Sequence, residues 1–166
     1  MLPAEYRAIE QAPQITRADL AALIGVRLGA LLTGRRADAA LITDVRNNWA
    51  ATWIMAVARA GVMEPFANHA FQPRAVVRRV DLAQATARLL PAIAARNPVK
   101  VKGWETARLK FIDLAPGHLA YPAASIAVAA GVMSTGPANT FQPSRAVTGA
   151  EAVEAIAKVE ELSGLR

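Results

Sequence analysis

Apolar residues recur at the spacing of one helix face along two stretches of the chain. Over residues 49–60 the apolar positions match the helical period; they are Trp49, Trp53, Ile54, Val57 and Ala58. Gly61 follows directly, where a glycine in the left-handed conformation commonly ends a helix. Residues 120–130 are equally apolar and lead into Gly131, with Pro122 near their start, where proline is tolerated. The pattern predicts one helix in each stretch.

Three other stretches begin with a helix-start signal or its remnant. "TRAD" at residues 16–19 and "TGAE" at 148–151 predict capping boxes, in which a threonine hydroxyl and an acidic side chain each accept a main-chain N–H. "RRVD" at 78–81 offers no hydroxyl, and Pro91 is expected to kink or end the helix that follows. The apolar residues behind the three starts predict the helices of a central bundle: Leu20, Leu23, Ile24, Leu28 and Leu31; Leu82, Leu89 and Leu90; Val153, Ile156, Val159 and Leu162.

These predicted helices belong to a repeat. "AGVMEPFANHAFQP" at residues 60–73 returns as "AGVMSTGPANTFQP" at 130–143, with matching ends and a different middle. We interpret the matching ends as packing anchors, so Val62, Met63 and Phe71 are expected in the core. The variable middle is expected to be a solvent-exposed loop, since loops tolerate sequence change.

A partial third copy, "ITRADLAALIGVRLGALL", lies near the N-terminus and aligns with the closing half of each full unit. Each full unit is predicted to form a helix, a loop and a second helix. The whole chain, residues 1–166, is therefore interpreted as one repeat-built unit, divided into a partial repeat at 11–34, a repeat at 41–95, a basic linker at 96–110 and a repeat at 111–163.

The composition of the chain favours one fold class and excludes several kinds of functional site. Hydrophobic residues make up 54% of the chain but aromatic residues only 5%, so alanine carries much of the apolar content, which favours an all-α fold. The absence of cysteine excludes disulfides and thiolate zinc sites. His69 and His118 have no clustered acids, so we expect no metal and no cofactor. No catalytic motif or transmembrane run is present, and an enzyme is not expected.

The net charge of +6 is concentrated in the middle of the chain. Residues 66–110 contain nine basic and two acidic residues. One interpretation is a solvated surface that promotes solubility, and the other is a surface for an anionic partner, either a glycan or nucleic acid. The candidate basic patch consists of Arg74, Arg78, Lys100, Lys102 and Lys110.

The ordered motifs resemble the S-layer homology (SLH) domain repeat, which has an acid, then Trp-Ala, a helix ended by Gly, Phe-x-Pro, and Thr-Arg-Ala-Glu. The matching residues are Asp44, Trp49, Gly61, Phe71 and Pro73 in the first full unit, and Asp113, Gly131, Phe141, Pro143 and "VTGAE" in the second. The resemblance implies a pseudo-threefold bundle of helix-loop-helix repeats. It also implies non-covalent anchoring of exported proteins to cell-wall polysaccharide, often through an acidic, pyruvylated sugar.

The resemblance further implies ligand-binding grooves between repeats. The residues carried over are Arg17, Asp44, Trp49, Arg79 and Asp113. An arginine fork suits a carboxylate, a carboxylate accepts hydrogen bonds from sugar hydroxyls, and an indole face stacks on a sugar ring.

Structural roles stay open for the same residues. The two arginines could tie repeats together through the two aspartates, the aspartates could serve as N-caps or turn acceptors, and Trp49 could pack in the core. Gly149 stands where a third arginine is expected and Leu119 where a second tryptophan is expected.

The predicted function is a non-catalytic, exported module at the cell envelope that binds an anionic wall or envelope polysaccharide. The signal for export is expected to lie outside this chain. The alternative is a degenerate SLH-fold module that binds other envelope proteins, or that serves as a structural part of a larger exported protein. Nucleic-acid binding through the basic middle region ranks after both.

Overall fold

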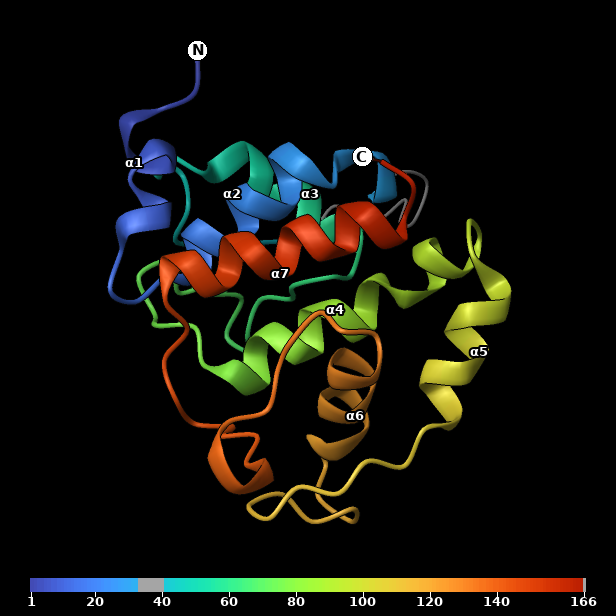
Figure 1. The fold of residues 1–166 in the computed structure, drawn as a ribbon. Coiled ribbons are helices and arrows are strands. Elements are labelled where there is room, and N and C mark those ends of the chain that lie inside the picture. The colour runs from blue at the N-terminus through green and yellow to red at the C-terminus, as the bar shows by residue number, and fades with distance from the viewer. Residues whose placement is uncertain (33–40, 166) are drawn as a thin grey trace.

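The computed structural model describes residues 1–32 and 41–165, and within them the fold is all-α, with isolated bridges and no strand. Figure 1 shows α7 crossing the molecule, with α2 and α3 on one side of it and α4 and α6 on the other. The elements are α1 (Ala4–Arg7), η1 (Ile9–Gln11), α2 (Arg17–Arg27), η2 (Gly29–Leu31), α3 (Ala51–Arg59), α4 (Arg79–Ala94), α5 (Pro98–Thr106), α6 (Tyr121–Ala129), η3 (Pro137–Asn139) and α7 (Gly149–Leu162), where η marks a 3₁₀ helix.

The two apolar stretches form the predicted helices α3 and α6. α3 packs against α2, and α6 packs against α4. Both helices end as the sequence predicts, because Gly61 has φ 73° and Gly131 has φ 76°, a conformation open to glycine at no steric cost. The predicted anchors are also confirmed: Val62, Met63 and Phe71 are all buried.

A ring of three main-chain hydrogen bonds ties together the segments that precede the three long helices. The N–H of Ile15 donates to the carbonyl of Val147, that of Val147 to Val77, and that of Val77 back to Ile15, each at 2.9 Å. All three side chains are fully buried. The ring therefore joins the starts of α2, α4 and α7 at the centre of the core.

Of the two predicted capping boxes, the one at α2 is confirmed and the one at α7 forms only in part. "TRAD" forms the complete capping box, since Thr16 accepts from the N–H of Asp19 and Asp19 accepts from the N–H of Thr16. At α7 only the threonine half exists: Thr148 Oγ1 accepts from the N–H of Glu151 at 3.1 Å. The expectation that Glu151 closes this box is wrong, because its carboxylate is bound to arginines.

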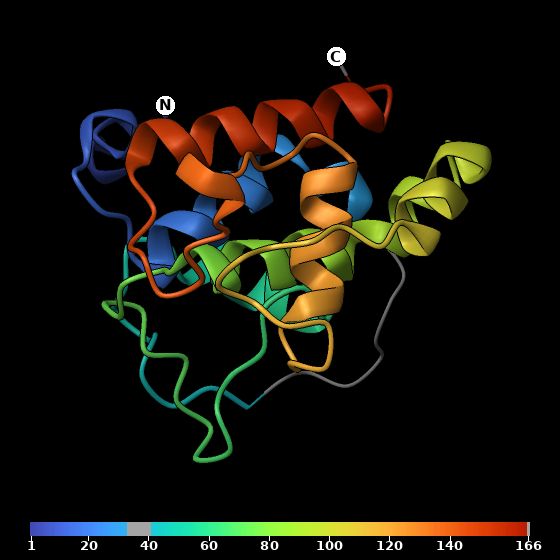
Figure 2. The ribbon, with the colours of Figure 1, turned by 60° about the horizontal axis from the view of Figure 1, so that its bottom comes forward.

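The structure adds detail to two expectations for the middle of the chain. Pro91 does not end α4, which continues to Ala94. Part of the predicted linker is helical, since α5 begins with Pro98 at its first position, where proline is tolerated. Buried Val101 and partly buried Trp104 pack α5 against the core, and the helix lies at the edge of the molecule (Figures 1 and 2). Residues 33–34 of the predicted partial repeat lie outside the described residues.

Candidate functional site

Arg79 is a buried cation held by two carbonyls and one carboxylate. It is the first residue of α4 and is 3% exposed. Its Nε donates to the carbonyl of Phe141 at 2.7 Å, and its Nη2 donates to the carbonyl of Ser134 at 2.6 Å. Its Nη1 donates to Oε2 of Glu151 at 2.6 Å. Because a buried charge is stable only when paired, Arg79 fastens α4 to α7 and to the loop before it.

Arg17 makes two equivalent bonds from the start of α2. Its Nε donates to the carbonyl of Phe71 at 2.7 Å, and its Nη2 donates to the carbonyl of Glu64 at 2.8 Å. The guanidinium carbon lies 4.8 Å from the ring centre of Phe66 and 4.3 Å from that of Phe71. Burial lowers the pKa of Arg17 below its ordinary value, and the nearby charge of Asp81 opposes this shift. The side chain is half-buried and stays a cation.

Asp44 closes the turn that carries Phe71. Its Oδ1 accepts from the N–H of Phe71 at 2.7 Å, and its Oδ2 accepts from the N–H of Gln72 at 2.9 Å. Gln72 has φ 55°, and this left-handed conformation is unfavourable for a residue other than glycine. Asp44 stabilises it by binding both N–H groups, so within the fold it acts as a turn acceptor.

Asp113 plays the same part in the second unit. It accepts from the N–H groups of Phe141 and Gln142, both at 2.8 Å. Burial by itself would raise the pKa of Asp113, but these two hydrogen bonds outweigh it and lower the pKa below its ordinary value. The stabilisation from Asp113 is therefore present above its unfolded-state pKa and is lost as the pH falls through its lower folded-state pKa.

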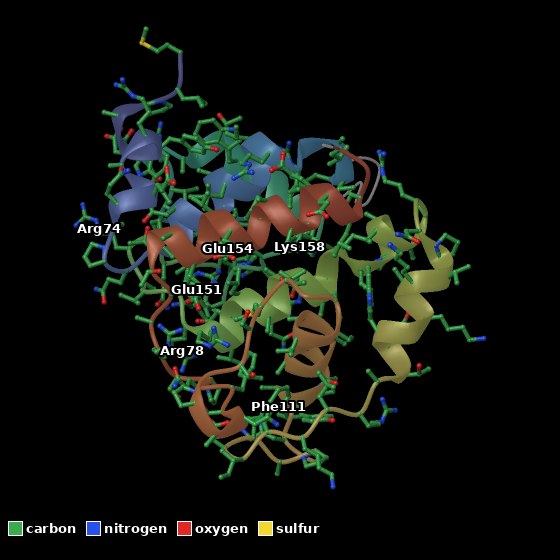
Figure 3. All side chains as sticks on the ribbon, in the orientation of Figure 1. Arg74, Arg78, Phe111, Glu151, Glu154 and Lys158 are labelled. Carbon is green, nitrogen blue, oxygen red and sulfur yellow. The ribbon has the colours of Figure 1, made fainter. Side chains whose placement is uncertain are left out.

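Each arginine lines a groove between a loop and a long helix. Groove A, of about 270 Å³, is lined by Arg17, residues 62–66, and Asp81, Gln84 and Arg88 of α4, together with Val77 and Ala85. Groove B, of about 530 Å³, is lined mainly by Arg79, residues 131–136, Gln142, Arg145, and Glu151, Glu154 and Lys158 of α7. Figure 3 shows these three α7 residues following one another along the helix. The grooves have the same position relative to their repeats.

The other candidate residues lie away from these two grooves. Asp44 lines a separate open hollow of about 710 Å³ together with Arg74. Trp49 is half-buried and packs edge-to-face on Trp53, with 6.2 Å between ring centres. Asp113 is exposed on the surface. The structure therefore places Arg17 and Arg79 in the grooves but does not bring the aspartates or Trp49 into them.

Within residues 1–32 and 41–165, no group of three or more His, Cys, Asp or Glu side chains is arranged to hold a metal ion. No helix in this part of the chain is both long and apolar enough to cross a membrane.

Comparison with known families gives matches over both full units. Residues 41–83 and 115–153 match the model of the S-layer homology domain. The chain carries S-layer homology domains. The matched residues include Arg79 and Glu151, whereas Arg17 lies outside them, so the predicted partial SLH copy at residues 11–34 stays a prediction.

Two S-layer proteins are similar to the chain. It is 33% identical over 121 residues to the S-layer protein sap of Bacillus anthracis. It is 32% identical over 121 residues to an S-layer protein of Bacillus thuringiensis subsp. finitimus. Each match covers 73% of this chain and 14% of the relative. The chain thus spans about a seventh of the length of these curated relatives.

The candidate basic patch of this SLH chain is split between two sides of the molecule. Arg74 and Arg78 lie at the left of Figure 3, whereas α5, which carries Lys100 and Lys102, lies at the right. These four residues and Lys110 are all exposed. Arg78 pairs with Asp81 at 3.4 Å. The structure therefore does not gather the five residues on one face.

Sequence analysis missed two residues of the SLH grooves. Phe66 lines groove A and is 45% exposed, but it lies in the loop that varies between copies. Glu151 lines groove B and binds both Arg79 and Arg145. Its place in "TGAE" pointed to a local cap instead. Only the aromatic character of Phe66, in a loop of otherwise small and polar residues, could have marked it.

Proposed function

We propose that this chain is a non-catalytic SLH module that anchors a larger exported protein at the cell envelope by binding an anionic wall or envelope polysaccharide between its repeats. The proposal rests on one observation, that Arg17 and Arg79 each line a groove beside a loop of the following unit. An arginine whose orientation is fixed by carbonyls presents its remaining N–H groups in a defined direction, as recognition of a carboxylate requires. The SLH matches and the S-layer relatives support a role in anchoring at the cell surface.

The proposal includes a pseudo-threefold arrangement of the repeats at residues 11–34, 41–95 and 111–163. The ring of main-chain bonds supports it, because each repeat contributes one residue: Ile15, Val77 or Val147. In such an arrangement grooves A and B are two of three equivalent interfaces. The N-terminal segment fills the third, where the N–H of Gly149 donates to the carbonyl of Ala12 at 2.9 Å.

Side chains on the rims of the two grooves have the chemistry for an anionic sugar. Arg88 in groove A and Lys158 in groove B occupy equivalent places on their helices and supply positive charge. Asp81, Glu151 and Glu154 supply carboxylates that accept hydrogen bonds from sugar hydroxyls. A ligand that combines hydroxyls with negative charge fits this mixture better than a uniformly charged polymer does.

Binding to purified wall polysaccharide tests the proposal. Wild-type chain should be retained on polysaccharide-containing sacculi both at low salt and at about 0.5 M salt, where exposed charge–charge attraction is largely screened. The double variant Arg88→Gln with Lys158→Gln should lose most of this retention. Lys100→Gln with Lys102→Gln, on exposed positions of α5, is the matched control and should bind like wild type.

Two results would count against polysaccharide binding in the grooves. One is retention of the wild type that disappears in salt, and the other is equal retention of the groove variant and the α5 control. Arg79 is unsuitable for this test, because removing a buried cation that holds three acceptors would disturb the fold itself.

A protein partner is the second candidate, and exposed apolar residues favour it. Leu119 is 94% exposed and Ile112 is 74% exposed, and Leu119 stands where the other SLH copy has Trp49. Treating the sacculi with protease before the binding assay separates the two candidates. Retention that survives the treatment supports the polysaccharide, whereas retention that is lost, and that Leu119→Ser also reduces, supports a protein.

A further inference from the structure

Exposed basic residues surround α5, the helix that lies outside both regions matched by the S-layer homology model. Residues 96–110 contain five basic residues and one acidic residue, a net charge of +4. The basic residues are all exposed; they are Arg96, Lys100, Lys102, Arg108 and Lys110. None of the five forms an ion pair within the described part of the chain. The positive charge of this segment is therefore open to an external partner.

The orientation of α5 is fixed by its inner face and by the segment that follows it. Val101 is 2% exposed and Trp104 is partly buried, and through them the helix packs against α4 and α6. From α6, the hydroxyls of Tyr121 and Ser125 donate hydrogen bonds to main-chain carbonyls just after α5. The opposite face of α5 therefore points outward in a defined direction, at the edge of the molecule (Figure 2).

The outward face of α5 combines an exposed apolar side chain with two flanking lysines. Successive helical residues are about 100° apart around the axis, so Val99 lies almost opposite the buried Val101. Lys100 and Lys102 then lie on the two flanks of the helix. Val99 is 84% exposed. The acid of the segment, Glu105, lines a hollow between α5 and α6, on another side of the helix. The outward face is thus basic with an apolar centre.

The surrounding elements do not neutralise this face. The first turn of α5 contains a lysine and no acid, whereas the first turns of α2, α4 and α7 each contain an acid. A lysine beside the partial positive charge of a helix N-terminus is unfavourable for the helix itself. α6 contains no charged residue, and residues 83–94 of α4 contain one, Arg88. An anionic partner would therefore be attracted by the basic side chains and by the helix end together.

We propose that the outward face of α5 binds the surface of a membrane that contains anionic phospholipids. The ammonium groups of Lys100 and Lys102 lie at the level of the lipid phosphates, and their aliphatic stems cover part of the apolar boundary. Val99 enters that boundary between them. The exposed valine favours a lipid surface over a nucleic acid, because a polyanion offers an apolar side chain no apolar surroundings. The inference goes beyond the proposed function and does not depend on polysaccharide binding.

Co-sedimentation with lipid vesicles tests the inference. The probes are vesicles of phosphatidylcholine alone and vesicles of phosphatidylcholine with an equal part of phosphatidylglycerol, whose headgroup is anionic. The wild-type chain should sediment with the mixed vesicles and stay in solution with phosphatidylcholine alone. Raising the salt concentration to about 0.5 M should weaken the binding, because the attraction between exposed charges is then largely screened.

Three variants at exposed positions separate charge from apolar contact. Lys100→Gln with Lys102→Gln should weaken binding to the mixed vesicles about thirtyfold, the effect expected for two lysines at an anionic lipid surface. Arg74→Gln with Arg78→Gln removes the same charge from the other side of the molecule and is the matched control, which should bind like wild type. Val99→Ser keeps the charge and should weaken binding about threefold through lost apolar contact. Circular dichroism would verify that each variant keeps the helical signal.

Several results would overturn the inference. They are failure of the wild type to bind the mixed vesicles, equal binding to both kinds of vesicle, and equal losses in the α5 variant and the control. Binding of double-stranded DNA that exceeds vesicle binding, together with no effect of Val99→Ser, would assign the face to nucleic acid instead. The sacculi assay tests the proposed function separately, because Lys100→Gln with Lys102→Gln should lose vesicle binding and keep retention on sacculi. Loss of both in this variant would also contradict the inference, since the face would then serve the wall polymer.

Discussion

The starts of α4 and α7 occupy the same position in two SLH copies but are packed in different ways. At both starts the first residue donates a main-chain hydrogen bond of 2.9 Å, Arg79 to the carbonyl of Arg145 and Gly149 to that of Ala12. At α4 the side chain then extends into the following loop and binds three acceptors. At α7 there is no side chain, and a Cβ atom added to Gly149 would lie 1.7 Å from the carbonyl oxygen of Ile9.

This comparison shows that, at the start of α7, main-chain atoms of the N-terminal segment have replaced the arginine side chain that is found at the start of α4. η1 packs against α7, so the N-terminal segment takes the space that the loop and arginine occupy elsewhere. From sequence, Gly149 marks a missing ligand-binding arginine. The structure adds a steric reason for glycine at this point, which is the close approach of Ile9. Three pairs of substitutions test this comparison, from the largest expected effect to the smallest.

Replacing the buried arginine should have the largest effect. Arg79→Ala leaves two carbonyls without their donor and Glu151 with only Arg145, so we expect a loss of about 3 kcal/mol in the free energy of unfolding. Arg17→Ala removes two bonds to carbonyls at a half-buried site and should cost less, about 1–2 kcal/mol. Urea unfolding of both variants measures the difference. Equal losses would mean that the pairing with Glu151 contributes nothing to stability.

Adding one methyl group at Gly149 should have an intermediate effect. Gly149→Ala forces the Cβ against Ile9 and should cost about 2 kcal/mol, the usual range for overpacking a tight site. Gly103→Ala is the matched control, because its Cβ meets no atom within 4 Å inside α5. It should raise stability slightly, since alanine favours helix more than glycine does. Thermal unfolding that ranks the two variants in the reverse order would contradict the close packing of the N-terminal segment.

Removing a threonine cap should have the smallest effect. Thr148→Ala loses the hydrogen bond from the N–H of Glu151, and Thr16→Ala loses the one from the N–H of Asp19. Each should cost about 1 kcal/mol. Chemical denaturation should therefore give similar losses for both variants, even though only α2 has a complete capping box. An unchanged midpoint for Thr148→Ala would show that the bond to Arg79 already holds the start of α7.

Local signals in the sequence predicted the parts of the fold that local physics decides. The glycines that end α3 and α6 and the buried anchors Val62, Met63 and Phe71 were all expected from the repeat. α5 was missed because only Val101 and Trp104 mark its inner face, too few to set a helical period. Pro91 suggested a helix end, yet α4 continues past it.

The candidate site was harder to predict from the sequence than the fold was, because its decisive contacts join residues far apart in the chain. Arg17 and Arg79 were selected through the SLH motif, but their carbonyl partners are main-chain atoms, which leave no trace in the sequence. Glu151 fits the rule for a capping box, and only the folded chain shows it bound to Arg79 instead.

The ring formed by Ile15, Val77 and Val147 fixes the order in which the chain can acquire its final form. Ile15 is synthesised early, but its N–H must wait for the carbonyl of Val147. Contacts between distant residues form late, because a long stretch of chain must first be brought together. A growing chain can therefore pair α2 with α3, and later α4 with α6, while the centre of the core stays unassembled. The centre of the core therefore stays incomplete until the segment that precedes α7 is present to close the ring.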